Sequence, residues 1–360
     1  AINANRDFSA IAVAVVLHRG APRVRCRSTE EPGEECHCRI GALDLLSSLN
    51  PAQQEAVRHT DGPLLILAGA GSGKTRVIAH RIAYLVSERI AHPDQIMAVT
   101  FTNKAAGEMR TRILALLPEN AGGAPLIATF HSLGVRLLRE FHEKAGLPRA
   151  FSIWDRDDSM RVIKRTLESQ GVEQFQPRSI LSAISRQKGD GVSLREYEAK
   201  VSSFREKTIA EVWRRYDEAL AAEGALDFDD LLARTLLLLK TSKETLSLLQ
   251  NRFQYITIDE YQDTNRSQYE IVRLLAGEKQ NVCVVGDIDQ NIYSWRGADI
   301  EHLLSFEESF PGAKVVTLEQ NYRSTRTILA AANAVIAKNT RRREKHLFTD
   351  NGTGEPITIY

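Results

Sequence analysis

Short apolar runs alternate along the chain with longer segments whose apolar residues recur every three or four positions. The runs that we expect to form buried strands are residues 64–68, 95–101, 126–129, 255–258, 281–285 and 313–318. Segments of helical period follow these runs, for example at 76–89 and 104–117. Apolar strands that alternate with amphipathic helices are typical of an α/β fold built on a parallel sheet.

Between the third and fourth runs, the apolar residues recur almost everywhere at the spacing of three or four that is typical of helices. We expect helices there at residues 136–143, 156–170, 178–187, 206–222 and 228–239. Because this stretch separates strands of one sheet, we interpret residues 129–253 as an inserted helical subdomain. The flanking segments, 43–128 and 254–319, then form one α/β lobe.

The first run leads into a loop of small residues that ends in a lysine and a threonine. The loop consists of Ala68, Gly69, Ala70, Gly71, Ser72, Gly73, Lys74 and Thr75. Glycines lack a Cβ, so several backbone N–H groups can turn inward, and the following helix adds the positive end of its dipole. This pattern indicates a nucleotide site in which Lys74 reaches the terminal phosphates and Thr75 ligates Mg²⁺. Ala68 stands where the pattern usually has its first glycine.

The later runs end in charged or amide side chains. In an open α/β sheet, ligands gather at the carboxyl ends of the strands. Asp259 and Glu260 follow the fourth run, and we assign Asp259 to the metal ion and Glu260 to the attacking water. Gln290 follows the fifth run and is placed to sense a γ-phosphate. Arg323 follows the sixth run and is a candidate arginine finger.

Several other side chains have both a structural and a functional interpretation. Gln53 lies three residues after Asn50, a spacing that closes a helix capping box. Tyr293 and Trp295 lie beside an arginine and are candidates either for stacking nucleic-acid bases or for the protein core. His131 ends the third run, where it is either structural or close to bound DNA.

The 360 residues have the composition of a soluble globular protein, with 43% hydrophobic and 26% charged residues. The net charge of +1 gives no overall attraction to nucleic acid, so such contacts must come from local surfaces. No apolar run is long enough to span a bilayer. The four cysteines show no disulfide framework, which fits a reducing cytoplasm.

The apolar residues of segment 1–42 recur at no regular spacing. The Cys-His-Cys sequence at 36–38 and the more distant Cys26 lack the paired spacing of a structural zinc site. We interpret this segment as a poorly ordered extension or an artefact. Because the chain begins at Ala1 rather than Met, we expect it to be a fragment.

Several short blocks occur in the order of one protein family. Residues 49–351 resemble the UvrD, PcrA and Rep group of superfamily 1 DNA helicases. The matching blocks are residues 49–53, 68–75, 100–112, 129–132, 227–232, 259–265, 285–298 and 320–325. The resemblance implies a RecA-like P-loop NTPase lobe, interrupted by an all-helical subdomain and followed from residue 320 by the truncated beginning of a second RecA-like lobe.

The same resemblance implies roles for individual residues. Gln53 reads the adenine, Tyr322 stacks on it, and Arg76 makes another nucleotide contact. The catalytic roles fall on Lys74, Asp259, Glu260, Gln290 and Arg323, with Thr75 and Asp259 on the metal. The implied DNA-binding residues are Phe101, Thr102, Asn103, His131, Tyr293 and Trp295.

The family's activity implies an ATP-dependent helicase that moves 3′ to 5′ along single-stranded DNA and unwinds duplexes. The implied cofactors are ATP and Mg²⁺, and the partners are single-stranded and tailed duplex DNA, unidentified repair or replication proteins, and no membrane. Two alternatives remain: a nucleotide-dependent DNA-binding module that does not unwind, and the motor part of a helicase–nuclease.

Overall fold

The computed structural model describes residues 42–294, 297–339, 343 and 345–358. The cysteines at 26, 36 and 38 and the predicted DNA-binding residue Trp295 lie outside the described residues, so the interpretations made for them stay predictions.

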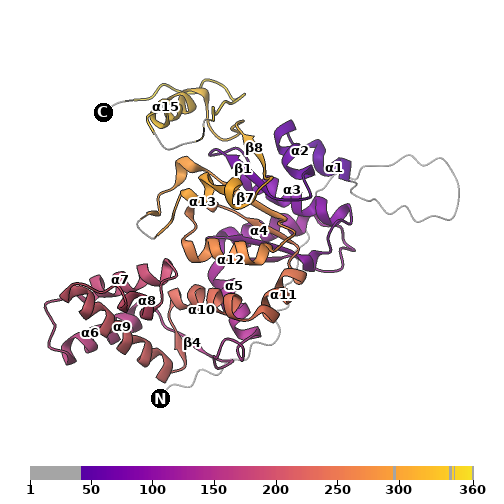
Figure 1. Cartoon of the computed structure of the whole chain (residues 1–360). Helices are drawn as coiled ribbons and strands as arrows, with labels where there is room; N and C mark the ends of the chain where they lie inside the picture. Colours follow the sequence, from indigo (N-terminus) through magenta and orange to yellow (C-terminus); the bar gives the residue numbers. More distant parts are fainter. Residues whose placement is uncertain (1–41, 295–296, 340–342, 344, 359–360) are drawn as a thin grey trace, which may run out of the picture. The chain divides into compact units, whose positions relative to one another are not determined.

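A six-stranded sheet whose strands all run parallel forms the centre of the described structure (Figure 1). In spatial order, its strands are β3 (Leu126–Thr129), β2 (Ile96–Thr100), β6 (Tyr255–Ile258), β7 (Val282–Gly286), β1 (Leu64–Ala68) and β8 (Lys314–Leu318). Each end lies within about one residue of the run predicted for it. The predicted α/β class with a parallel sheet is confirmed.

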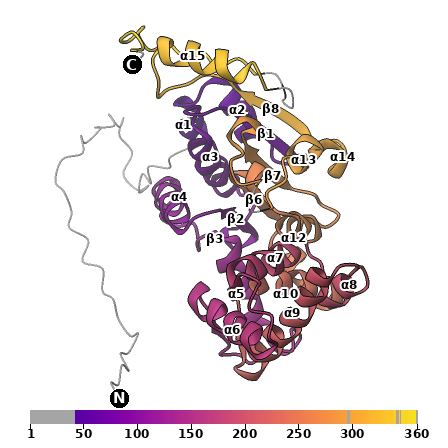
Figure 2. The same cartoon turned by 90° about the vertical axis from the view of Figure 1, so that its left-hand side faces the viewer.

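Successive residues of each strand point to opposite faces, and helices cover both faces (Figure 2). The face of Leu64 and Ile66 packs against α2 (Pro51–Arg58), α3 (Lys74–Ser87) and α4 (Asn103–Leu116). The face of Leu65 and Leu67 packs against α5 (Phe130–Glu140), α10 (Phe228–Thr241), α11 (Lys243–Arg252), α12 (Arg266–Ala276), α13 (Glu301–Leu304) and α14 (Phe306–Ser309). Because both faces are buried, the strands appear in the sequence as unbroken apolar runs.

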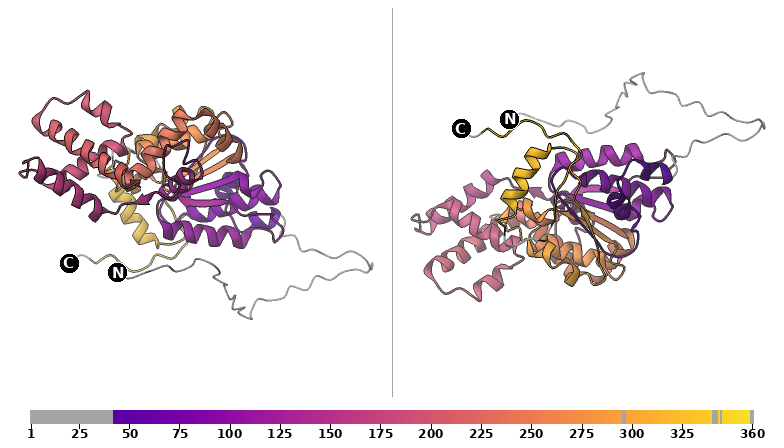
Figure 3. Two further views of the ribbon diagram at one scale, coloured as in Figure 1. Left: turned by 90° about the horizontal axis from the view of Figure 1, so that it is seen from below. Right: turned by 90° about the horizontal axis from the view of Figure 1, so that it is seen from above.

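A second group of helices packs around its own core (Figure 3). These helices are α6 (Arg156–Ser169), α7 (Pro177–Gly189), α8 (Leu194–Glu198) and α9 (Phe204–Ala222). Trp213 and Tyr216 of α9 are buried at the centre of this core. A short parallel pair, β4 (Ser152–Ile153) and β5 (Ala225–Leu226), joins the two ends of the segment and was not predicted. The boundaries at 129 and 253 stay a prediction, since α5, α10 and α11 share the core of the sheet.

The remaining elements are short or follow the sheet. They are α1 (Ala42–Ser47), the 3₁₀ turns η1 (Pro93–Gln95), η2 (Tyr261–Asp263) and η3 (Ile288–Gln290), and α15 (Arg326–Ile336) after β8. Beyond α15, Phe348 forms a bridge with Gln320, just after the end of β8. Among the described helices, none has the length and apolar character needed to cross a membrane.

Candidate functional site

The carboxyl ends of the strands lie together at one edge of the sheet because all the strands are parallel. In strand order, the predicted site residues at this edge are His131 after β3, Phe101, Thr102 and Asn103 after β2, Asp259 and Glu260 after β6, Gln290 and Tyr293 after β7, Lys74 and Thr75 after β1, and Tyr322 and Arg323 after β8. The loop after β7 lies between the nucleotide-site residues of β6 and β1, and it carries both Gln290, assigned to the nucleotide, and Tyr293, assigned to DNA.

Gly71 and Gly73 give the phosphate loop, residues 68–75, its curvature. Their φ angles are 69° and 88°, a region that side-chain-bearing residues seldom adopt. A Cβ added at Gly71 would lie 2.6 Å from Asn321 Nδ2, so this position also needs the space. Gly73 is the N-cap of α3, and no side chain caps this helix end. The first amides of α3 therefore have no side-chain cap, as an anion site requires.

Lys74, Asp259 and Glu260 meet at this edge. Lys74 Nζ lies 3.3 Å from Glu260 Oε2. Asp259 is buried and accepts the Glu260 N–H at 3.0 Å. Burial and the charge of Glu260 raise the pKa of Asp259 to about 7, and the Lys74 ammonium offsets this only in part. A cation beside Asp259 would favour its charged form.

Glu260 has a left-handed backbone, with φ 51° and ψ 45°, although it is not glycine. Such a conformation costs about 1–3 kcal/mol and is common at functional sites. Gln262 donates from Nε2 to Glu260 Oε2 at 2.9 Å, which holds the carboxylate. Burial and the charge of Glu260 also raise the pKa of Asp263 to about 6, and Asp263 Oδ1 is buried with no hydrogen-bond partner among the described residues.

Gln53 satisfies the capping interpretation and also contacts the phosphate loop. Its Oε1 accepts the Asn50 N–H at 3.1 Å, while Asn50 Oδ1 accepts the Gln53 N–H at 2.8 Å, so the capping box is present. Gln53 Nε2 also donates to Ser72 O at 3.0 Å. An amide has two N–H groups and two lone pairs on its oxygen, so the contacts with described residues leave one N–H and one lone pair of this buried side chain unused.

The segment after β8 lies directly on the phosphate loop. The Tyr322 N–H donates to Gly71 O at 3.0 Å, and Asn321 Nδ2 donates to Ala70 O at 2.6 Å. Asn321 Oδ1 accepts the Arg323 N–H at 2.8 Å. This geometry brings the predicted arginine finger and the predicted adenine-stacking tyrosine next to the loop.

Two further predicted nucleotide contacts are anchored by hydrogen bonds. Asn50 Nδ2 donates to the hydroxyl of Tyr322 at 2.8 Å, and the Tyr322 side chain is 47% exposed. Arg76 Nη2 donates to Ser48 O at 2.8 Å. Tyr322 is therefore held beside the helix of Gln53 with much of its ring open to solvent.

Gln290 is held by an aspartate of its own loop. Its Nε2 donates to Asp287 Oδ2 at 2.5 Å, and Asp287 is 3% exposed. The Asp287 N–H in turn donates to Gln262 Oε1 at 2.9 Å. Hydrogen bonds thus connect Gln290 with Glu260 through Asp287 and Gln262.

Aromatic rings cluster at the opposite end of the sheet edge. His131 and Phe228 stack with their ring centroids 3.8 Å apart and an interplanar angle of 24°, and Phe228 is 57% exposed. Burial lowers the pKa of His131 to about 4, so its ring is neutral near pH 7. Phe101 meets Phe130 edge to face, with centroids 6.0 Å apart. Neutral, partly exposed rings are suited to stacking rather than to charge pairing.

The other residues assigned to DNA are polar or lie in the loop after β7. Thr102 caps α4 by accepting the Ala105 N–H at 3.1 Å, and both Thr102 and Asn103 are exposed. Tyr293 is half-buried. Trp295 lies outside the described residues, so its relation to Tyr293 stays a prediction.

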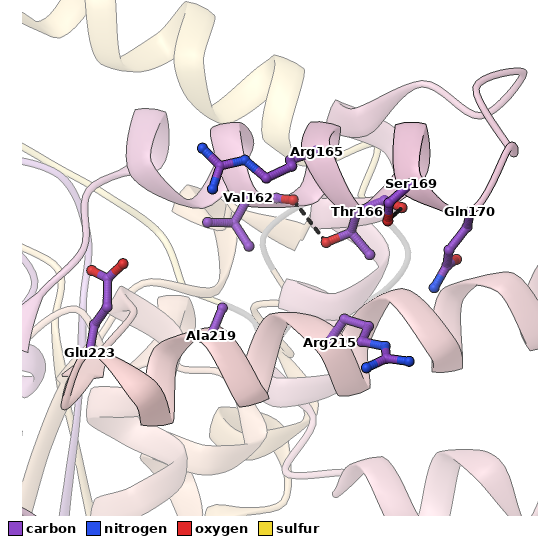
Figure 4. Close-up of a pocket in the computed structure, with 8 residues that line it drawn as sticks. All are labelled: Val162, Arg165, Thr166, Ser169, Gln170, Arg215, Ala219 and Glu223. Carbon is purple, nitrogen blue, oxygen red and sulfur yellow. Dashed lines mark hydrogen bonds between the residues drawn. The ribbon is translucent and has the colours of Figure 1, made fainter.

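A separate hollow of about 420 Å³ lies between α6 and α9 (Figure 4). Small side chains such as Ala219 leave the space, and the Thr166 hydroxyl donates to Val162 O of its own helix at 2.9 Å. Arg215 at its rim pairs with Glu211 and Glu218. None of the lining residues is a predicted site residue, and the hollow has no part in the nucleotide or DNA assignments.

Three residues at the site were not singled out from the sequence. Asp263 and Asn321 lie within matching blocks, but nothing in their spacing distinguishes them from neighbouring polar residues. Phe228 lies in the block 227–232, where the periodicity predicts the start of an ordinary helix. Its signal was a large apolar residue directly between two aspartates at a helix start.

Comparison with known proteins gives two adjoining family matches. Residues 49–311 match the UvrD/REP helicase N-terminal domain, and residues 316–360 match the UvrD-like helicase C-terminal domain. The chain is 50% identical over 318 residues to the ATP-dependent DNA helicase PcrA of Bacillus subtilis, covering 88% of this chain and 43% of that protein.

Two staphylococcal proteins of the same name are similarly close. PcrA of Staphylococcus epidermidis is 49% identical over 88% of this chain and 44% of its own length, and PcrA of Staphylococcus aureus is 48% identical over 88% and 43%. The chain thus spans less than half the length of these relatives. With a family model matched over most of its residues, the chain belongs to the UvrD/Rep helicase family.

Proposed function

We propose that this chain is the N-terminal motor portion of an ATP-dependent DNA helicase that moves 3′ to 5′ on single-stranded DNA and unwinds duplexes. The observation that carries the proposal is the shared sheet edge, where the single loop after β7 carries both the nucleotide candidate Gln290 and the DNA candidate Tyr293. A change in the nucleotide site can therefore act on a DNA-facing residue through one short segment. The names of the relatives, all ATP-dependent DNA helicases, support the same activity.

ATP and Mg²⁺ fit the residues at the phosphate loop. The curved loop and the uncapped start of α3 suit phosphates, and Lys74 adds a positive charge. Thr75 and Asp259 would hold Mg²⁺, which neutralises developing charge on the phosphates. Asp263 Oδ1 has no hydrogen-bond partner among the described residues, and this and the raised pKa values of Asp259 and Asp263 support a site that gains positive charge when loaded.

The residues around the phosphate loop have the other catalytic and nucleotide-binding roles. Glu260, held by Gln262, polarises the attacking water, and Arg323 stabilises charge on the transferred phosphoryl group. The free N–H and lone pair of Gln53 match the acceptor and donor of an adenine edge, while Tyr322 stacks on the ring and Arg76 adds a contact. Gln290 senses the γ-phosphate.

DNA would run from the β2 and β3 end of the same edge to the loop after β7. The proposed contacts are Phe101, Thr102, Asn103, His131, Tyr293 and Trp295, to which we add Phe228 because its exposed ring stacks on His131. Base stacking is worth about 1–3 kcal/mol per base and carries little sequence preference. We infer that the strand is gripped mainly by stacking on Phe228, Phe101 and the loop after β7, and that repair or replication proteins supply pathway specificity.

A strand-displacement assay on the full-length protein tests the proposal. Wild type should unwind a 3′-tailed duplex and not a 5′-tailed one, in a reaction that needs ATP and Mg²⁺. Lys74→Ala should lower the rate by at least about a hundredfold, because a charged group aimed at the phosphates is lost. Lys164→Ala, which alters a lysine 69% exposed on α6, is the matched control and should behave as wild type.

The other outcomes separate the alternatives. Equal unwinding by wild type and Lys74→Ala would refute the motor. ATP-dependent DNA binding without unwinding would instead favour a nucleotide-dependent binding module. Shortening of the displaced strand in the same reaction would favour the motor of a helicase–nuclease.

A further inference from the structure

Lys345 reaches across to the loop after β7 and is buried there. It lies in residues 343–348, beyond α15, within the part of the chain that matches the C-terminal domain model. Its ammonium pairs with Asp287 Oδ1 and lies 3.0 Å from Asp289 Oδ2. The side chains of Lys345, Asp287 and Asp289 are 8%, 4% and 6% exposed. Two buried carboxylates this close need a shared cation, because each repels the other.

Asp287 joins this cation to Gln290. One carboxylate oxygen, Oδ1, accepts from Lys345 and from the Asp289 N–H at 3.0 Å, and the other, Oδ2, accepts from Gln290 Nε2 at 2.5 Å. Lys345 thus fixes the position of the Asp287 carboxylate, and this carboxylate in turn fixes the Gln290 side chain.

The same aspartate leads to the candidate catalytic base. Its N–H donates to Gln262 Oε1 at 2.9 Å, and Gln262 Nε2 donates to Glu260 Oε2 at 2.9 Å. Glu260 in turn pairs with Lys74. A continuous set of hydrogen bonds and ion pairs therefore runs from Lys345 to the phosphate loop.

The segment that carries Lys345 is tied to the residues after β8. The Phe348 N–H donates to Glu319 O at 3.1 Å, and the Asn321 N–H donates to Phe348 O at 2.7 Å. Arg343 anchors the same segment by donating to Leu304 O at 2.7 Å and pairing with Glu307 at 2.6 Å. Movement of Tyr322 and Arg323, which follow Asn321, would therefore be transmitted to Lys345.

We propose that Lys345 is a positioning residue that sets Gln290 through Asp287 and so links the C-terminal-domain segment to the loop after β7, which carries both Gln290 and Tyr293. This role rests on the proposed function, since it concerns how the motor couples its two sites. Lys345 touches neither nucleotide nor DNA in this role; it acts through Asp287.

The first test measures the loop directly and needs no activity. Hydrogen exchange is compared for peptides covering residues 286–291 in the full-length wild type, Lys345→Met, Lys345→Arg and the control Lys338→Met, which alters an exposed lysine just after α15. We expect Lys345→Met to speed exchange by about tenfold, Lys345→Arg to restore much of the protection, and Lys338→Met to have no effect. Unchanged exchange in Lys345→Met overturns the proposal, whether or not the protein unwinds DNA.

The second test asks whether Lys345 acts through Gln290. In DNA-stimulated ATP hydrolysis, Lys345→Met should lower kcat by about tenfold while the KM for ATP stays within about twofold. In a Gln290→Ala background the same substitution should have no further effect on kcat. Two results would overturn the positioning role and mean that Lys345 only supports the fold. One is that Lys345→Met lowers kcat as much in the Gln290→Ala background as in wild type. The other is that the KM for ATP rises by the same factor as kcat falls. The Lys74→Ala comparison remains the separate test of the motor itself.

Discussion

Two lysines, Lys188 in α7 and Lys74 at the start of α3, differ in how many carboxylates surround them and in how exposed their partners are. Lys188 is 4% exposed, and its Nζ lies 2.8 Å from Asp227 Oδ2 and Asp230 Oδ1 and 3.5 Å from Asp217 Oδ1. Lys74 is 12% exposed and pairs only with Glu260 among the ion pairs described. Lys188 is enclosed by three aspartates, whereas Lys74 lies at a partly exposed edge beside Glu260.

The pKa values reflect the surroundings of each lysine. Burial lowers the pKa of Lys188, but Asp230, Asp227 and Asp217 together more than offset this and hold it above the ordinary value. Near Lys74, the pKa of Asp259 rises to about 7 because burial and Glu260 outweigh the lysine. Burial raises the pKa of Asp230 as well, despite Lys188. The two sites therefore differ in enclosure: the aspartates around Lys188 are left buried and uncompensated if it is removed, whereas Glu260 beside Lys74 is 32% exposed and accessible to a charged ligand.

The largest effect that tests this comparison is on stability. Lys188→Met leaves three aspartates around a buried apolar side chain, so the free energy of unfolding should fall by about 3–5 kcal/mol. Urea unfolding followed by tryptophan fluorescence measures this, since Trp154 and Trp213 lie in the same helical core. Lys164→Met is the exposed control.

Lys74→Ala should change stability by less than about 1 kcal/mol, because Glu260 is 32% exposed and a partly solvated pair contributes little. If Lys74→Ala destabilised the fold as much as Lys188→Met, the distinction between the two clusters would be wrong.

A smaller effect concerns pH and Asp229 in α10. Burial and the charge of Asp227 raise its pKa from 3.8 to about 6, although Ser185 and Lys188 favour its charged form. A carboxyl whose pKa is higher in the folded state stabilises the fold below about pH 4, and this contribution is lost as pH rises through about 6.

Wild type should therefore lose up to about 3 kcal/mol of stability relative to Asp229→Asn between about pH 4 and 7. Unfolding free energies of the two proteins across this range give the difference. A difference that does not vary with pH would show that Asp229 is charged throughout.

The strands and the family could be predicted from the sequence because both depend on local signals. Strands buried on two faces are unbroken apolar runs, and the phosphate loop needs small residues followed by Lys74 and Thr75. The capping box of Gln53 is also local and is present. The helix Lys243–Arg252 was not singled out, although its start is capped by Ser242 accepting the Thr245 N–H.

The Lys188 cluster and the stack of His131 on Phe228 could not be predicted, since each joins residues far apart in the chain. The left-handed backbone of Glu260 could not be predicted from its residue type either, because it depends on how the end of β6 meets η2. The roles of the site residues stay predictions, because geometry alone does not identify a bound ligand.

The smallest of the three expected effects concerns Phe228, which lies in one helical turn with both a buried aspartate of the Lys188 cluster and the proposed DNA surface. Phe228 lies between Asp227, which pairs with Lys188, and Asp229, yet its own ring is 57% exposed and stacks on His131. Phe228→Ala should weaken single-stranded DNA binding by about 1–3 kcal/mol through lost base stacking, with stability within about 1 kcal/mol of wild type. Fluorescence anisotropy with a labelled oligonucleotide measures the affinity, and its salt dependence should keep its slope because no phosphate contact is removed. Leu237→Ala, which alters a 50% exposed apolar residue of the same helix, is the control and should bind as wild type. If both variants bound DNA normally while Phe228→Ala unfolded early, Phe228 would belong with Lys188 to the structural cluster rather than to the DNA surface.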